Sequence, residues 1–414
     1  MELKQRINEA NEEAFRRLTA GDPVLVDVAP AGEAIPGLRD RMILHSGPPV
    51  SWERMCGAQR GACVGMCLFE GWASDPAEAE RLLASGAIAL EPNHPHSAVG
   101  PMAGTITSNM WVWVVENKAF GNRACCRQVE SFQQFGDHSR DALGLLAQWR
   151  DIWGPALRSA VFRMGGIPLK PMIARALQMG DEMHNRVVAS SSLFANAVAP
   201  VLADCGLPRE QLASTLYYVA NHPFLFLGLS MAAGKAAADP VRGVEASTLV
   251  TAMARNGTEF GIQVSGLDGE WFTAPSPRVQ GLYLPGWKEQ DAGLDMGDSA
   301  ITETVGWGGF AIGGAPGILS FTGGTAEQAL AYSREMRSIT VGLSPDYLLP
   351  ALDFAGTAVG IDIRKVARTN LVPVIDTAIA HKEPGHGIIG GGIVRPPMAC
   401  FTQALTRFAE RYRD

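Results

Sequence analysis

The sequence predicts an α/β (α+β) protein in which two mixed α/β domains flank a central helical domain or insertion. Short runs of β-branched and aromatic residues occur in the first 140 residues and again after residue 260. Residues 141–238, by contrast, follow mainly the helical period of about 3.6 residues. A chain of 414 residues is long enough for two or three domains. We therefore expect an N-terminal α/β domain over 1–140, a helical domain over 141–240 and a glycine-rich α/β domain over 241–414.

The N-terminal part is expected to alternate helices and strands. Residues 2–19 carry apolar side chains at helical spacing, and a further helix is expected to begin at Asp75-Pro76. Residues 51–72 are helical in pattern but rich in glycine, and each glycine costs a helix about 1 kcal/mol relative to alanine. A helix there requires the close approach of another backbone or of a ligand. The expected strands are 24–28, 42–45, 87–90 and 110–116.

The middle and the C-terminal part are expected to differ in the same way. Residues 171–204 form the longest helical pattern, and the apolar run 223–234 is too short for a bilayer, which needs about 20 residues, so we expect a buried helix. Helices are expected over 325–340, capped by Thr325, and over 398–412. A glycine loop is expected at 385–392. The expected C-terminal strands are 260–264, 271–273, 281–284, 309–312 and 318–321.

Composition excludes several classes of function. The formal net charge is −7, with 35 Lys and Arg against 42 Asp and Glu and no basic block, so we expect no binding to nucleic acid. The N-terminus lacks the apolar run of a secretion signal, and we expect a cytoplasmic protein that does not bind membranes. The seven cysteines include no CxxC pair, so neither a disulfide framework nor a structural zinc site is predicted. We also predict no cofactor.

Six polar clusters favour a site for a small anion. In the first, His94 and His96 stand in a proline-bound turn that we expect to lie outside the core. They are interpreted as metal ligands, as anion or acid–base groups, or as an exposed turn. In the second, Asn117 and Lys118 follow the aromatic strand, where α/β proteins often bind ligands, although a solvated loop would have the same pattern.

The third cluster is residues 180–186, which we expect to be helical. On a helix, Asp181, His184 and Asn185 would share one face, with Arg186 beside them. A carboxylate beside a histidine suits a general base or an anion clamp, and the alternative is a polar helix face.

The remaining three clusters lie in the C-terminal part. Arg255 and Asn256 precede a glycine at an expected helix end, and Arg suits planar recognition of carboxylate or phosphate. Polar residues gather between 298 and 304 within apolar surroundings, among them Asp298 and Glu303. The sixth cluster, at 381–392, combines histidines with glycines whose N–H groups suit an oxyanion. It is neither a Walker A loop nor a Rossmann fingerprint.

At these clusters the sequence resembles the YahG/YlbE-like family of bacterial proteins. The resemblance covers nearly the whole chain and implies a two-part α/β architecture with a helical domain. The matching stretches are His94-Pro-His96 with Val99–Gly104, Val115–Lys118, Met179–Glu182 with His184–Arg186, Arg255–Gly257 with Phe260–Ile262, Gly297–Gly306, and Ile379–His381 with the glycine loop.

Members of this family resemble a subunit of oxamate carbamoyltransferase, an enzyme of anaerobic allantoin (purine) breakdown. That enzyme interconverts oxamate and carbamoyl phosphate with oxalurate and phosphate. The resemblance implies a homo-oligomer with companion subunits, one of them FdrA-like, and small anionic substrates. The Ser-Thr-Arg-Thr-Arg phosphate motif of aspartate and ornithine carbamoyltransferases is absent, so any carbamoyl phosphate would bind at a different kind of site.

Taken together, the clusters and the resemblance define a set of expected site residues. The expected catalytic residues are His381, His184, Asp181 and Glu303. The expected substrate-binding residues are His94, His96, Asn117, Lys118, Asn185, Arg186, Arg255, Asn256, Asp298, His386 and Gly387. Two other hypotheses stay open: a non-catalytic scaffolding or regulatory subunit that binds an FdrA-like partner, and a metal-dependent amidohydrolase that uses His94, His96 and His184.

Overall fold

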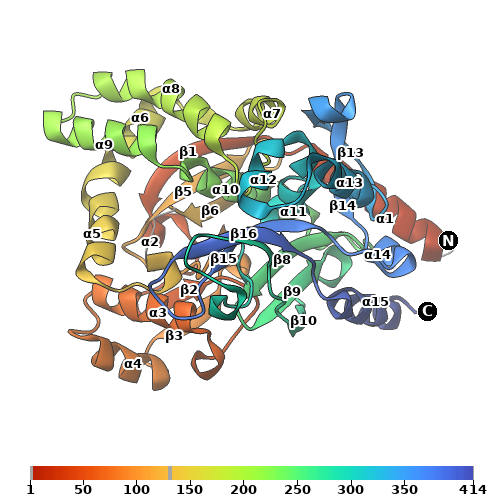
Figure 1. Cartoon of the computed structure of the whole chain (residues 1–414), viewed down its shortest axis with the longest axis horizontal. Helices are drawn as coiled ribbons and strands as arrows, with labels where there is room; N and C mark the ends of the chain where they lie inside the picture. Colours follow the sequence, from red (N-terminus) through yellow and green to blue (C-terminus); the bar gives the residue numbers. More distant parts are fainter. Residues whose placement is uncertain (1–2, 129–132, 414) are drawn as a thin grey trace.

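The computed structural model describes residues 3–128 and 133–413, and it confirms a mixed α/β fold (Figure 1). A five-stranded sheet of order β4-β6-β5-β1-β7 organises the N-terminal part. Its neighbours are antiparallel, except that β4 and β6 are parallel. The strands are β1 (Pro23–Pro30), β4 (Ala98–Val99), β5 (Trp111–Asn117), β6 (Arg123–Arg127) and β7 (Ile167–Pro168).

The C-terminal part contributes two further sheets and a hairpin. The four-stranded sheet has the order β10-β9-β8-β12, and the three-stranded sheet has the order β11-β16-β15. Strands β15 and β16 run across the middle of the molecule in Figure 1. The strands are β8 (Val250–Asn256), β9 (Glu259–Val264), β10 (Phe272–Pro275), β11 (Gln280–Tyr283), β12 (Met296–Gly297), β15 (Ile375–Ala380) and β16 (Ile388–Val394), with the hairpin β13 (Thr340–Leu349) and β14 (Ala355–Ile361). A separate parallel pair, β2 (Met42–His45) and β3 (Ala89–Pro92), belongs to the N-terminal part.

Helices cover these sheets and fill the upper left of Figure 1, where α5, α8 and α9 lie. Helix α10 is buried over its whole length and packs on β5 and β6. The helices are α1 (Leu3–Thr19), α2 (Ala31–Ala34), α3 (Gly57–Phe69), α4 (Pro76–Ala84), α5 (Arg140–Gln148), α6 (Gly154–Met164), α7 (Lys170–Gln178), α8 (Val188–Asp204), α9 (Arg209–Asn221), α10 (Leu225–Ala238), α11 (Ile301–Thr304), α12 (Leu319–Thr322), α13 (Ala326–Met336), α14 (Ile363–Thr369) and α15 (Met398–Tyr412).

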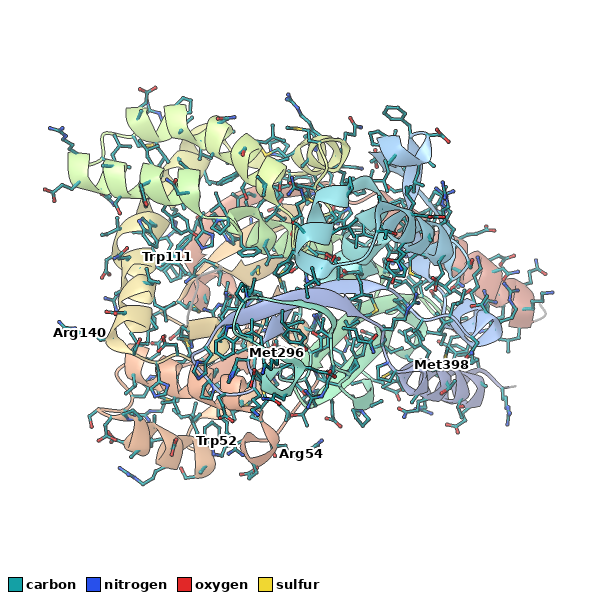
Figure 2. All side chains as sticks on the ribbon, viewed as in Figure 1. Trp52, Arg54, Trp111, Arg140, Met296 and Met398 are labelled. Carbon is teal, nitrogen blue, oxygen red and sulfur yellow. The ribbon has the colours of Figure 1, made fainter. Side chains whose placement is uncertain are left out.

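The core connects segments that are far apart in the sequence. One large apolar cluster contains Trp113 of β5 and Phe226 of α10, and it also contains Ile301 and Trp307 from the C-terminal part. Side chains fill the space between the elements, as Figure 2 shows. Ile301 and Trp307 flank Glu303, so this packing fixes the segment that carries that buried carboxylate.

Most expected elements are present within a few residues of their predicted bounds, but several predictions were wrong. Residues 309–312 and 318–321 are not strands; they form 3₁₀ turns and α12. The turns bring Gly309 so close to Val374 that an added Cβ would lie 2.3 Å from its carbonyl oxygen. The glycine loop at 385–392 is also partly a strand, since β16 begins at Ile388. Strand β6, helix α14 and the hairpin of β13 and β14 were not predicted.

Two expectations about apolar or glycine-rich helices are confirmed. The run at 223–234 forms the buried α10, and within the described residues no helix is long and apolar enough to cross a membrane. The glycine-rich segment forms α3, and another backbone does approach it: a Cβ on Gly61 would lie 2.3 Å from the carbonyl oxygen of Gly136.

This contact predicts that Gly61→Ala lowers the free energy of unfolding. A methyl group at residue 61 must displace the backbone at Gly136, and overpacking of this kind typically costs about 1–3 kcal/mol. Urea denaturation monitored by circular dichroism measures the effect. The matched control is Gly144→Ala in α5, where nothing lies within 4 Å of the new methyl group and alanine favours the helix. Equal losses of stability in the two variants would contradict the assignment.

Candidate functional site

The loop between α7 and α8 carries His184 and Asn185. The prediction that this segment is helical was wrong, because Gly180 and Met183 have φ angles of +96° and +75°, which end any helix. The buried Glu182 carboxylate accepts hydrogen bonds from the backbone N–H groups of His184 (2.8 Å), Asn185 (2.6 Å) and Arg186. Burial, with Asp376 nearby, holds the pKa of Glu182 well above its usual range. The loop is therefore fixed by a carboxylate in place of helical hydrogen bonds.

His184 forms a buried pair with Glu303 of α11. Its Nδ1 atom lies 2.9 Å and 3.2 Å from the two carboxylate oxygens. Glu303 also accepts hydrogen bonds from the Thr302 hydroxyl (3.0 Å) and from the Gly309 N–H (3.0 Å). Burial opposes the ionisation of both partners, yet their mutual attraction gives a net rise in the pKa of His184 and a net fall in the pKa of Glu303. Each partner therefore favours the charged form of the other.

Asp376 of β15 adds another buried carboxyl group to this centre. Its Oδ2 atom accepts a hydrogen bond from the side-chain amide of Asn185 at 3.1 Å, whereas Oδ1 has no hydrogen-bond partner among the described residues. Burial is the main reason that the pKa of Asp376 rises to about 7. Ligand atoms of His184, Glu303 and Asp376 all lie within 4.8 Å of one another, close enough to bind one ion.

Arg255 lies behind this centre, fully buried. It was expected at a helix end, but it belongs to β8. Its guanidinium binds both carboxylate oxygens of Asp295, at 2.7 Å and 3.0 Å, and it donates to the hydroxyls of Ser299 (3.3 Å) and Thr377 (3.1 Å). Arg255 is therefore held within the protein by a buried ion pair and positions two hydroxyl groups.

Those two hydroxyls and His184 line a small cavity of about 30 Å³. Asn185 and Gln134 are the other polar residues on its wall. The rest of the wall is apolar. It consists of Pro101, Met102, Phe135, Phe224, Leu227, Ala378 and Ile388.

The histidine pair at 94 and 96 does not join this centre. The expectation that His94 lies outside the core was wrong: it is completely buried, packs edge-on against Trp271, and its Nε2 atom lies 3.6 Å from Asp298. Asp298 accepts hydrogen bonds from the N–H groups of Gly47 (2.8 Å) and Gly100 (2.9 Å) and from the Asn93 amide (2.8 Å). Burial raises the pKa of Asp298 to about 6 against the effect of these donors. His96 lies nearer the surface, 2.8 Å from Glu91.

Five other expected site residues make contacts within the fold. Asn117 donates to the Ala236 carbonyl at the end of α10, and Lys118 pairs with Glu116 at the surface. The carboxylate of Asp181 accepts hydrogen bonds from the N–H groups of Ala189 and Ser190, in the first turn of α8. The Asn256 amide donates to the carbonyl of Pro48, and the Nε atom of Arg186 donates to that of Gly180.

His381 and His386 lie together at a second place. Their ring centroids are 4.2 Å apart, and His381 also packs against Trp287 at 4.9 Å. His381 lines a separate cavity of about 220 Å³ with Arg278 and Lys382, and Gly387 lies in the turn that leads into β16. The glycines of β16 itself serve close packing, because a Cβ on Gly391 would lie 2.2 Å from the ring of Phe321.

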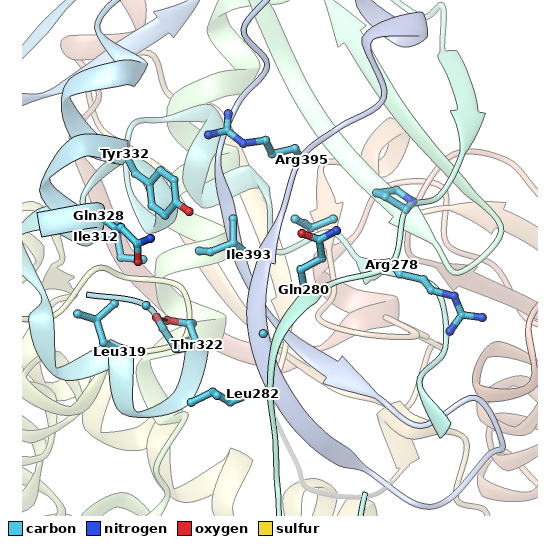
Figure 3. Close-up of a pocket in the computed structure, with 15 residues that line it drawn as sticks. Arg278, Gln280, Leu282, Ile312, Leu319, Thr322, Gln328, Tyr332, Ile393 and Arg395 are labelled. Atoms are coloured by element: carbon cyan, nitrogen blue, oxygen red, sulfur yellow. Dashed lines mark hydrogen bonds between the residues drawn. The ribbon is translucent and has the colours of Figure 1, made fainter. Parts of the chain in front are cut away.

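A wider groove of about 520 Å³ runs between β11, β16, α12 and α13 (Figure 3). None of the expected site residues lines it. Its Arg395 already pairs with Glu335, at 2.8 Å and 3.1 Å. Its Arg278 donates hydrogen bonds to the carbonyls of Glu289 (3.4 Å) and Ala292 (3.0 Å).

Sequence reasoning missed part of the centre. Asp376 and Thr377 stand inside the apolar run that forms β15, and Asp295 precedes the cluster at 298–304. A charged residue within a strand that is otherwise apolar was a usable signal, because such a group needs a partner when it is buried.

By fold, the chain matches a solved structure described as a conserved protein of unknown function from Enterococcus faecalis V583. The TM-score is 0.98 and the identity 44%, with 99% of each chain covered. The family model described as oxamate carbamoyltransferase subunit AllG matches residues 88–299. This range includes His184, Asn185, Arg255 and Ser299.

Two full-length relatives agree with that match. The chain is 44% identical to the oxamate carbamoyltransferase subunit AllG of Escherichia coli (strain K12), over 98% of this chain and 98% of that protein. It is 45% identical to the uncharacterized protein YahG of the same strain, over 99% of this chain and 88% of that protein. The chain therefore belongs to the AllG family, which confirms the resemblance found in the sequence.

The buried pair of Arg255 and Asp295 predicts a large loss of stability for Arg255→Gln, even without any ligand. Removal of the Arg255 guanidinium leaves the Asp295 carboxylate buried and uncompensated, which typically costs about 3–5 kcal/mol. Thermal and urea unfolding of the purified chain measure it. The control is Arg407→Gln, which breaks an exposed pair with Glu270 and should change stability far less. An Arg255→Gln variant as stable as the control would indicate that Arg255 is kept for ligand binding alone.

Proposed function

We propose that this chain is a subunit of a carbamoyltransferase that acts on a small anionic amide such as oxamate, with carbamoyl phosphate as the donor. The observation that carries the proposal is the buried pair of His184 and Glu303 at the wall of a small cavity. The name of the E. coli relative, a subunit of oxamate carbamoyltransferase, supports the same reaction.

The polar groups on the cavity wall are suited to donate hydrogen bonds. Nδ1 of His184 is held by Glu303, so Nε2–H is the group that remains for a ligand. The hydroxyls of Ser299 and Thr377 accept hydrogen bonds from Arg255, so their own hydrogen atoms are available. Donors that converge beside a buried positive charge favour an oxygen atom that carries negative charge.

Such an oxygen develops during carbamoyl transfer. The amide nitrogen of oxamate attacks the carbonyl carbon of carbamoyl phosphate, and the carbonyl oxygen becomes an oxyanion. The bond from carbon to the phosphate oxygen then breaks, and the proton from the attacking nitrogen can leave with the phosphate. Donors from His184, Ser299 and Thr377 would stabilise the oxyanion more strongly than the uncharged carbonyl, which lowers the barrier.

The size of the cavity favours a site that is completed by a companion subunit. A volume of about 30 Å³ is far below the roughly 300–1,000 Å³ of most small-molecule sites, so the cavity by itself is too small to enclose two substrates. The phosphate and carboxylate groups would then lie outside it, against residues of an FdrA-like or other partner. The chain by itself would be inactive or nearly so.

The other two hypotheses are less well supported. In the described residues, the group of three side chains close enough to share an ion is His184, Glu303 and Asp376, and it contains neither His94 nor His96. That arrangement does not favour the amidohydrolase built on three histidines. A scaffolding subunit would not require His184 to be paired with Glu303 and to line a cavity. The scaffolding role is therefore the alternative that the transfer assay tests.

The proposal predicts that His184→Gln lowers kcat for carbamoyl transfer by about 100-fold or more, since loss of one oxyanion donor typically has an effect of this size. Glu303→Gln, which weakens the pairing of the imidazole, should also reduce kcat. Both are measured in the complex reconstituted with its companion subunits, with oxalurate formation from oxamate and carbamoyl phosphate as the readout.

The control is Glu270→Gln, the same chemical change in a surface ion pair, and size-exclusion chromatography confirms that each variant complex has assembled. Assembled complexes with unchanged kcat in both His184→Gln and Glu303→Gln would overturn the proposal and favour a scaffolding role.

A further inference from the structure

We infer that His184, Glu303 and Asp376 form a binding site for one divalent cation. The three residues come from the loop before α8, from α11 and from β15, and all are buried. Their ligand atoms lie within 4.8 Å of one another. One imidazole nitrogen and two carboxylates form a common type of ligand set for a divalent metal ion.

The distances fit one ion. Nδ1 of His184 lies 2.9 Å and 3.2 Å from the oxygens of Glu303. Two ligands at right angles, each about 2.1 Å from a metal ion, are separated by about 3 Å. The pair can therefore bind an ion with small movements, once the imidazole gives up its Nδ1 hydrogen.

An independent observation comes from Asp376. Its side chain is fully buried, Asn185 holds Oδ2, and the Oδ1 atom has no N–H donor among the residues that the structure describes. Burial and the neighbouring acidic group of Glu303 raise the pKa of Asp376. A buried carboxylate oxygen without a donor is rare in folded proteins and calls for a partner. A cation between Asp376 and Glu303 would supply it.

The local charge favours the same ligand. The carboxyls of Glu182, Glu303 and Asp376 surround a single imidazole, and in the described chain no Lys or Arg side chain forms an ion pair with any of them. Arg255 is committed to Asp295. Three buried carboxyl groups beside one imidazole repel one another when they ionise together, and a divalent cation between them would offset that repulsion.

The groups around the three ligands are arranged as an outer shell. Thr302 and the Gly309 N–H hold Glu303, Asn185 holds Asp376, and Glu182 fixes the backbone of His184. Such hydrogen bonds orient metal ligands in other proteins. The adjoining cavity is large enough to hold water, which could complete the coordination.

The inference deepens the proposed function at the same centre, and its catalytic meaning rests on that proposal. With an ion on Nδ1, the Nε2–H of His184 still faces the ligand, and the ion supplies the positive charge that the imidazolium otherwise carries. Binding itself can be measured without turnover and without companion subunits.

The test is calorimetric titration of the purified full-length chain, after treatment with a chelator and dialysis, with Mn²⁺ and separately with Zn²⁺. We expect one ion of at least one of these metals per chain, and electron paramagnetic resonance reports the bound Mn²⁺. Asp376→Asn and Glu303→Gln should each weaken binding at least tenfold. Asp353→Asn, an exposed carboxylate in a turn after β13, should leave the dissociation constant unchanged.

Absence of saturable binding up to about 1 mM of either ion, or equal affinity in the wild type and in both centre variants, would overturn the inference. The two proposals fail separately. A chain that binds the ion while His184→Gln transfers normally in the complex keeps the cation site and loses the oxyanion role. A chain that binds no ion while His184→Gln abolishes transfer keeps the proposed function and loses the cation site.

Discussion

The Glu303 carboxylate is the contact on which the centre depends, because it joins the loop at 180–186, helix α11 and the turn at 308–310, where one backbone hydrogen bond from Gly308 to Glu182 adds to it. It pairs with His184, and it accepts hydrogen bonds from Thr302 and from the backbone of Gly309. The chain must pass so close to it that a Cβ on Gly308 would lie 2.0 Å from its Oε1 atom. Glycine at residue 308, and the turns that follow it, are therefore part of the site and not a neutral connection.

Buried charge then organises the surrounding strands. Arg255 ties β8 to Asp295 and, through its other donors, to Ser299 and to Thr377 of β15. Asp298 performs the same task for the N-terminal part, because it accepts hydrogen bonds from Gly47, Asn93 and Gly100. Each of these groups would be costly to bury alone. Together they hold β8, β15 and the N-terminal loops in one arrangement around the cavity.

The sequence predicted the regular elements better than the site. Periodicity identified α1, whose burial follows the apolar pattern closely, and the length of the apolar run at 223–234 identified the buried α10. It failed at residues 180–186, where the Glu182 side chain replaces helical hydrogen bonds, and such a replacement leaves no periodic signal. Glu303 was identified as a polar residue in apolar surroundings, whereas His184 and Asn185 were identified through a shared helix face that the structure does not contain. Their partner Asp376 was missed, since pairing between residues 184 and 376 is a property of the tertiary fold.

Binding groups differ from structural groups in how many of their polar atoms the fold already occupies. Arginine suits anions in general, yet Arg255 has its guanidinium bound to Asp295, to the Gly297 carbonyl and to two hydroxyls, so its charge acts through Ser299 and Thr377. His184 is the reverse case, because Glu303 holds one of its nitrogens and leaves the other for the cavity. The cavity beside His184, of about 30 Å³, is far smaller than the roughly 300–1,000 Å³ of most small-molecule sites. Under the proposed function, that size is the physical reason to expect the rest of the site on another subunit.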